Sequence, residues 1–161
     1  LMYTPMPRSY GKMSLVLEVD PTKTAGQGFG SATGQYMDVC LKFDTQRLTG
    51  YGLRIIRTTK HAKAVDFLLV RYDEGQVTPI SDSVSATCYR TGCRIFIDFT
   101  DNQLSAYVTT KTPRPADSTL PHEVRLKADV SSNPFGGIHL QHTGSCGEST
   151  TMLHQLCVSW Y

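Results

Sequence analysis

The stretch Arg94–Thr100 (RIFIDFT), followed by the pair Asp101-Asn102 and by Gln103–Thr109 (QLSAYVT), decides the fold class of this chain. In both runs apolar residues alternate with polar ones, which is the period of a β-strand that buries one face. Asp and Asn favour the tight turn that would join two such runs. The segment therefore predicts a β-hairpin, with Ile97 and Leu104 among the residues that face a core.

Similar runs, separated by turn residues, continue over the rest of the chain. Thr (19 residues) and Val (11) are plentiful, whereas the helix formers Ala (8) and Glu (4) are scarce. No segment longer than a single turn has the period of a helix. Besides the hairpin, we expect strands at Ser14–Val19, Tyr36–Phe43, Tyr51–Thr58, Ala64–Tyr72, Gln76–Ser81, Val84–Cys88, Glu123–Val130, Gly137–Thr143 and Thr150–Tyr161.

This number of strands predicts two packed sheets. About ten short strands in one open sheet would twist severely and leave long edges exposed. The strand count exceeds that of an immunoglobulin-like domain, and the Cys-Trp-Cys spacing of that class is absent. We therefore predict an all-β, two-sheet antiparallel jelly-roll sandwich, with Phe67, Ile97 and Leu126 at inward positions.

Length and charge narrow the domain organisation and the partners. The chain has 161 residues, so we expect one domain over residues 1–161. A net charge of +2 without a run of like charges argues against nucleic acid. No apolar stretch approaches the roughly 20 residues that span a bilayer, so no membrane insertion is expected. The start at Leu1 shows no signal peptide, and we expect a domain excised from a longer polypeptide.

The five cysteines are an odd number, so at least one thiol is expected to be free or paired outside the chain. Cys40 and Cys157 lie in apolar strands, where we expect both to be small buried residues. Cys88 and Cys93 flank a short loop that could place them across a hairpin, so they could be bridged or free.

Catalytic and metal patterns are weak. Glu18 and Asp20 alternate on one strand, as a glycosidase pair would, but Pro21 follows at once and a solvated strand end is the favoured interpretation. His139 with His142, and His154 with Cys157, are three residues apart and would point to opposite faces of a strand, which disfavours zinc. We expect no cofactor, although a structural calcium ion is possible at acidic turn residues, namely Asp73, Glu74, Asp82, Asp101 and Asp117.

The alternation also predicts which side chains point away from the core. In Tyr36–Phe43 it places Phe43 inward with Met37, Val39 and Leu41, and Lys42 outward. The outward residues that could hold a sugar are Asp38, Arg54, Asp66 and Tyr107. A tyrosine ring can stack on a sugar, an arginine can donate paired hydrogen bonds and aspartates can accept from hydroxyls. A solvated ion-pair face is the alternative, and Thr22–Gln35 is the other place for a site.

The residues Asp38–Phe43, Thr49–Arg54, Asp66–Tyr72 with Gly75, and Ile95–Val108 resemble concanavalin A-like lectin and glucanase domains. The likeness covers about two thirds of the chain and consists of strand patterns and turns. The acidic E-x-D-x-x-E strand of the glucanases is not found, and no metal or sugar ligand of legume lectins can be transferred. The resemblance implies glycan binding or an accessory role, as in domains appended to secreted bacterial polysaccharide-processing proteins.

The expected function is therefore a non-catalytic carbohydrate-binding or accessory domain of an exported bacterial protein. Its expected location is secreted, periplasmic or on the cell surface, and its partners are a polysaccharide or glycan and other domains of the same polypeptide. Two alternatives remain. One is a glycoside hydrolase or polysaccharide lyase that uses Glu18 with Asp20, or Asp66 with Asp98. The other is a structural or protein-interaction module.

Overall fold

The structure is a computed structural model that describes residues 1–5, 10–21, 29, 33–60, 64–111, 120–143 and 151–161. These residues form strands and contain no helix. The strands are β1 (Met2–Tyr3), β2 (Met13–Pro21), β3 (Tyr36–Asp44), β4 (Thr49–Ile56), β5 (Val65–Asp73), β6 (Gln76–Pro79), β7 (Val84–Ala86), β8 (Cys93–Thr100), β9 (Gln103–Thr110), β10 (Val124–Asp129), β11 (Gly137–His142) and β12 (Thr151–Trp160).

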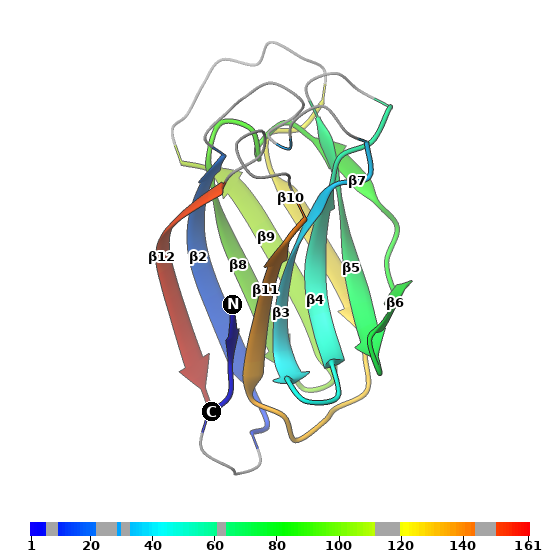
Figure 1. Ribbon diagram of the computed structural model, residues 1–161, viewed down its shortest axis with the longest axis vertical. Helices are drawn as coiled ribbons and strands as arrows, with labels where there is room; N and C mark the ends of the chain where they lie inside the picture. The colour runs from blue at the N-terminus through cyan, green and yellow to red at the C-terminus, as the bar shows by residue number, and fades with distance from the viewer. Residues whose placement is uncertain (6–9, 22–28, 30–32, 61–63, 112–119, 144–150) are drawn as a thin grey trace.

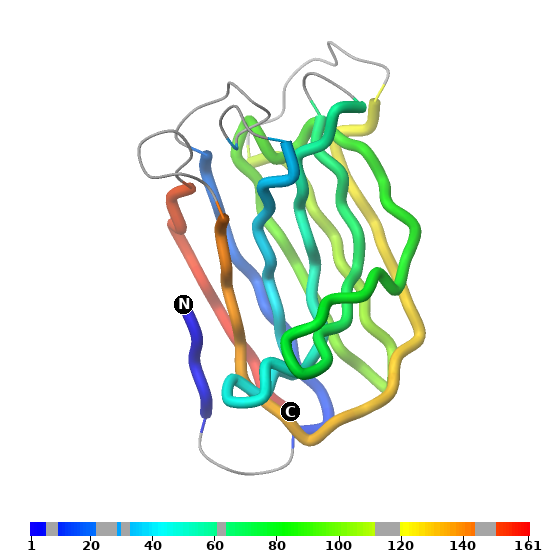
Figure 2. The backbone as a smooth tube through the Cα atoms, turned by 45° about the vertical axis from the view of Figure 1, so that its right-hand side comes forward, coloured from blue at the N-terminus to red at the C-terminus, as the bar shows by residue number. Residues whose placement is uncertain are grey.

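The strands form two antiparallel sheets packed face to face (Figures 1 and 2). The first sheet has the order β1-β11-β3-β4-β5-β6, and β7 also pairs with β5. The second sheet has the order β10-β9-β8-β2-β12. The predicted all-β, two-sheet antiparallel sandwich is confirmed.

The core lies between the sheets and is built from alternate residues of the long strands. Phe67 of β5 and Ile97 of β8 are completely buried there, and Leu126 of β10 is 9% exposed, as predicted. The predicted hairpin is also present, because Thr100 pairs with Gln103 across a two-residue turn. Both turn residues have positive φ angles, 48° at Asp101 and 65° at Asn102, which matches the twist of the strands that they join.

A β-bulge in β3 reverses the predicted facing of two residues. The register of β3 against β4 shifts between Leu41 and Asp44, and Lys42 has a φ of 51°. An extra residue in one strand exchanges the faces that follow it. Lys42 is therefore buried at the end of the sandwich, where its Nζ donates to the carbonyl oxygen of Tyr10, whereas Phe43 packs on the outer face of the sheet. The prediction of Lys42 outward and Phe43 inward is wrong.

The cysteines follow the predictions only in part. Cys40 is buried, as expected, but Cys157 is exposed because it points outward from the edge strand β12. Cys88 and Cys93 are both buried and both free.

In the described part of the chain no helix is long and apolar enough to span a membrane.

Candidate functional site

The four predicted ligand-binding residues lie on two different faces of the sandwich. Asp38, Arg54 and Asp66 point outward from β3, β4 and β5 of the first sheet, and Asp38 pairs with Arg54 in the ladder. Tyr107 points outward from β9 of the second sheet. The structure thus brings three of the four residues onto one face and places Tyr107 on the opposite side of the molecule.

Asp38 and Arg54 form a buried ion pair. Arg54 donates from Nε and Nη2 to the two carboxylate oxygens of Asp38, each at 2.8 Å, and Asp38 is completely buried. The Tyr72 hydroxyl donates to the same carboxylate, and the Tyr36 ring covers the guanidinium at 3.9 Å. Burial disfavours the charged guanidinium, but Asp38 outweighs this and raises the pKa of Arg54 above its ordinary value. Burial, with Asp38, also raises the pKa of Tyr72.

Asp66 is likewise engaged within the protein. Its carboxylate accepts hydrogen bonds from Lys60 Nζ at 2.9 Å and from Ser85 Oγ at 2.5 Å, and the residue is 4% exposed. Both predicted aspartates on this face therefore accept hydrogen bonds from neighbouring side chains. Each carboxylate thus has the internal partners that a buried polar group needs.

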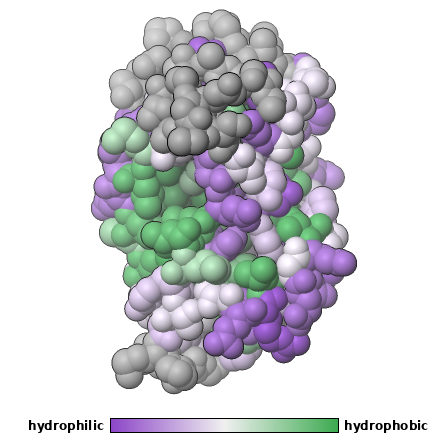
Figure 3. Space-filling model, in the orientation of Figure 1, coloured by the Kyte–Doolittle hydropathy of each residue, from purple (hydrophilic) through white to green (hydrophobic). Residues whose placement is uncertain are grey.

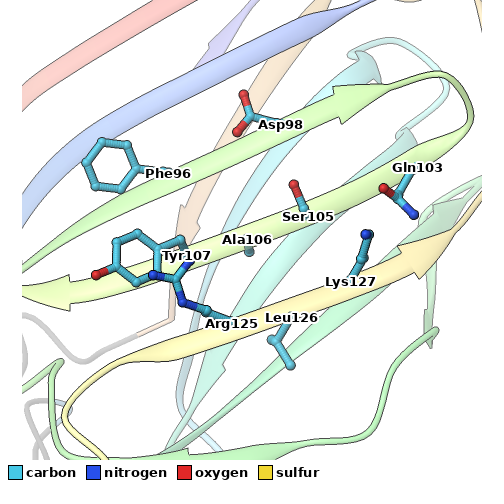
Figure 4. Close-up of a pocket in the computed structure, with 9 residues that line it drawn as sticks. All are labelled: Phe96, Asp98, Gln103, Ser105, Ala106, Tyr107, Arg125, Leu126 and Lys127. Atoms are coloured by element: carbon cyan, nitrogen blue, oxygen red, sulfur yellow. The ribbon is translucent and has the colours of Figure 1, made fainter.

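Tyr107 borders an open hollow of about 500 Å³ on the outer face of β8, β9 and β10 (Figure 4). Outward side chains of the three strands line it, while Ala106 and Leu126 lie between them with their side chains mostly buried. The outward lining residues are Phe96, Asp98, Gln103, Ser105, Tyr107, Arg125 and Lys127.

An aromatic platform crosses the three strands at one end of this hollow. Phe96 pairs with Tyr107 in the ladder, and Tyr107 pairs with Arg125. The rings of Phe96 and Tyr107 stack with their centroids 5.8 Å apart, and the Arg125 guanidinium lies 4.1 Å from the Tyr107 ring centroid. The Tyr107 hydroxyl donates to Glu123 Oε2 at 2.9 Å. These contacts hold the two half-buried rings in place and leave part of their surface open to solvent.

A polar row runs beside the platform, at the positions two residues away from it on each of the three strands. Asp98 of β8 pairs with Ser105 of β9, which pairs with Lys127 of β10. Ser14 Oγ of β2 donates to Asp98 Oδ1 at 2.5 Å and fixes that carboxylate. Carboxylate, hydroxyl and ammonium groups therefore lie in a line at the spacing of neighbouring strands, about 4.8 Å.

Of the residues that line this hollow, the sequence analysis predicted Tyr107 as a candidate and did not single out Phe96, Arg125 or Lys127. The signal was present, since Phe96 is an aromatic residue at an outward position of RIFIDFT, and Arg125 and Lys127 alternate with Leu126. Strand pairing, which brings these positions together, was not specified by that signal.

Glu18 and Asp20 form part of a half-buried charge network on the second sheet. Lys111 Nζ contacts Glu18 at 3.3 Å and Asp20 at 2.9 Å, Arg94 contacts Glu18 at 3.2 Å, and His154 Nε2 contacts Asp20 at 2.9 Å. The hydrogen bond from Lys111 is the main cause that lowers the pKa of each carboxylate. A glycosidase general acid needs a raised pKa, so this pair lacks that property.

The second candidate acid pair is separated by the whole sandwich. Asp66 lies on the outer face of the first sheet and Asp98 on the outer face of the second, so they cannot flank one glycosidic bond.

Among the described residues, no three His, Cys, Asp or Glu side chains gather as a metal site. The loop Thr22–Gln35 lies largely outside the described residues, as does Asp117.

No protein-family model and no curated protein matches the sequence. Among solved structures, the chain is similar to the carbohydrate-binding module CBM66 from Bacillus subtilis, with a TM-score of 0.59 and 11% identity over 98% of this chain and 80% of that one. It is also similar to the CBM2 module of the evolved Dit of Lactobacillus casei BL23 phage J-1, with a TM-score of 0.55 and 12% identity over 93% and 60% of the two chains.

A third similar structure is a variant of the GH43 protein BlXynB from Bacillus licheniformis, with a TM-score of 0.53 and 9% identity. That match covers 94% of this chain but 28% of the other. At these identities the three likenesses establish a shared β-sandwich fold.

Proposed function

We propose that this chain is a non-catalytic carbohydrate-binding module of the concanavalin A-like jelly-roll type, and that the hollow on β8, β9 and β10 binds the sugar. The observation that carries the proposal is the stacked pair Phe96 and Tyr107, held beside a row of polar side chains. The presence of carbohydrate-binding modules among the similar structures supports it.

The chemistry of the hollow suits a sugar ring. A pyranose has an apolar C–H face that stacks on an aromatic ring and a rim of hydroxyl groups that need hydrogen-bond partners. Phe96 and Tyr107 would supply the ring surface, while Asp98 accepts and Lys127 donates hydrogen bonds. Of the four residues predicted from the sequence, Tyr107 contacts the sugar in this proposal, and Asp38, Arg54 and Asp66 stabilise the opposite sheet.

The proposal includes a place of action and an organisation. We propose that the module works outside the cytoplasm, in a secreted, periplasmic or cell-surface bacterial protein, because that is where polysaccharides are encountered. Other domains of the same polypeptide would carry out any catalysis. Stacking and hydrogen bonding need no cofactor, and a calcium ion at the acidic turns would have a structural role only.

Affinity electrophoresis and a glycan array test the proposal. Wild type should bind at least one polysaccharide, and Tyr107→Ala or Phe96→Ala should weaken that binding about tenfold, or about 1.4 kcal/mol. Tyr107→Phe keeps the ring and should retain more of the affinity than Tyr107→Ala.

Arg125→Ala and Arg47→Ala provide a matched pair. Arg47 is exposed in the turn between β3 and β4 and pairs with Glu74, so its removal changes the net charge equally but leaves the hollow intact. Binding should fall for Arg125→Ala and stay the same for Arg47→Ala. Failure of wild type to bind any plant, algal or host polysaccharide would overturn the proposal, as would unchanged affinity in both aromatic variants.

A further inference from the structure

The edges of the two sheets differ in how they are protected from pairing with another chain. In the first sheet the outer strands are short: β1 has 2 residues, β7 has 3, and β6 has 4 and ends at Pro79. In the second sheet β10 carries Arg125, Lys127 and Asp129. Short strands, proline and charged side chains are the usual means of protecting an edge.

The strand β12 has none of these protections. It has 10 residues, TMLHQLCVSW, without Lys, Arg, Asp, Glu or Pro, and it pairs with β2 alone among the described strands. A register shift between Leu153 and Gln155 interrupts the ladder near the N-terminal end of this strand. The regular ladder from Gln155 to Trp160 is left with one row of backbone amide and carbonyl groups directed away from β2.

An apolar opening of the sandwich lies beside this unprotected edge. Leu156, Val158 and Trp160 pair with inward residues of β2 but remain partly exposed, and with Ile138 and the β1 segment they line a groove of about 450 Å³. Figure 3 shows apolar residues gathered on the side of the molecule where β12 lies in Figure 1. The most exposed large apolar residues on or next to this opening are Leu1 (66%), Met2 (56%), Tyr3 (50%), Leu153 (43%) and Tyr161 (70%).

We propose that this surface binds a second copy of the chain, with β12 of the two copies paired antiparallel about a twofold axis. Such an axis places each apolar opening next to its equivalent, so the surface is its own complement. At about 100 Å² for each exposed apolar side chain, these five residues would bury roughly 500 Å² per copy, and the partly exposed Leu156, Val158 and Trp160 would add roughly 100 Å². The total of about 1,200 Å² reaches the lower end of the range for specific interfaces.

Pairing at β12 has a consequence for sugar binding, which rests on the function proposed above. The two five-stranded sheets become one continuous sheet, and an antiparallel pair keeps both outer faces on the same side. The hollows centred on β9 of each copy are then seven strand spacings apart, about 34 Å at about 4.8 Å each. One repeating polysaccharide could bind both hollows, which raises the apparent affinity without new contacts.

Sedimentation of the 161-residue chain tests the dimer. Wild type should sediment at twice the monomer mass of 17.8 kDa. Val158→Lys and Leu156→Lys place a charge in the opening and should weaken dimerisation at least about tenfold. Leu48→Lys is the matched control, because Leu48 is 36% exposed on the turn between β3 and β4. It should remain dimeric.

Hydrogen exchange gives a second measurement that does not depend on a variant folding. The amides of Gln155–Trp160 that are directed away from β2 should exchange more slowly as the protein concentration rises. A monomer at every concentration, with concentration-independent exchange in β12, overturns the proposal. The bivalent arrangement is supported if the wild type is a dimer and if Val158→Lys and Leu156→Lys bind a short oligosaccharide normally but lose affinity for the long polymer. A dimer that binds no glycan leaves the interface established and contradicts the proposed function instead.

Discussion

The guanidinium of Arg54 donates two hydrogen bonds to the carboxylate of Asp38, and this aspartate has no exposed surface. An outward position in a sheet is therefore not the same as a solvated one. The Tyr36 ring covers the guanidinium and the Tyr72 hydroxyl donates to the carboxylate, so neighbouring side chains replace water at a place that strand alternation assigns to the surface.

Arg54→Ala should lower the free energy of unfolding by about 3–5 kcal/mol, because it leaves the buried Asp38 carboxylate without its counter-ion. Urea denaturation measures the change. The control is Arg47→Ala, whose pair with Glu74 is exposed and worth about 0–1 kcal/mol. An Arg54→Ala protein of normal stability with weakened glycan binding would mean that Arg54 is a ligand-binding residue.

Truncation of the core should distinguish inward from outward positions. Phe67→Ala and Ile97→Ala remove completely buried side chains and should each cost about 2–5 kcal/mol. Val16→Ala, on the half-buried outer row that includes Phe96, should cost clearly less. Equal losses at the three positions, measured by thermal or urea unfolding, would contradict the facing of β2 and β8.

Strand alternation predicted most of the fold. Each of the two sheets buries one face, so apolar and polar residues alternate along the strands with a period of two. The hairpin of β8 and β9 illustrates this, since its turn and its register both follow from local residues. The short strand β1 was not predicted, because two residues carry no period. The exchange of Lys42 and Phe43 was not predictable either, since a bulge is one residue of extra backbone without a sequence signature in that run.

The candidate site was predicted only in part, for a topological reason. Alternation assigns a residue to the inside or the outside of a sandwich but does not say which of two outer faces it occupies. Asp38 and Tyr107 were both outward, yet they belong to different sheets. Cys157 shows the same limit, because burial of an apolar strand depends on whether it lies at an edge, and the sheet order is set by pairing distant in sequence.

The thiols should differ sharply in reactivity. Burial raises the pKa of Cys88 to about 12 and holds the pKa values of Cys40 and Cys93 well above the ordinary value, whereas Cys157 is exposed. The thiolate is the reactive form. In a Cys146→Ser variant at pH 8, an alkylating reagent should modify Cys157 quickly and the three buried cysteines only after unfolding. Rapid modification of Cys88 in the folded protein would contradict its burial.

Lys42 should make stability depend on pH in the alkaline range. Its ammonium group is buried, donates to the Tyr10 carbonyl oxygen and lies 5.1 Å from the centroid of the Phe99 ring. Burial lowers the pKa of Lys42 below 10.5 in the folded protein. Between the folded pKa and 10.5 the unfolded chain binds more protons than the folded one, so the free energy of unfolding rises with pH across this window.

Lys42→Met keeps the length of the side chain but removes the titrating group. Comparing wild type with this variant separates the contribution of Lys42 to the pH dependence of stability from that of tyrosines and cysteines, which titrate in the same range. The stability of wild type relative to Lys42→Met should increase as pH rises through the window, as measured by urea unfolding at several pH values up to 10.5. Lys12→Met is the control at a lysine whose side chain is 49% exposed. A wild-type advantage that falls with pH, or stays constant, would show that the folded protein does not hold Lys42 in a buried environment.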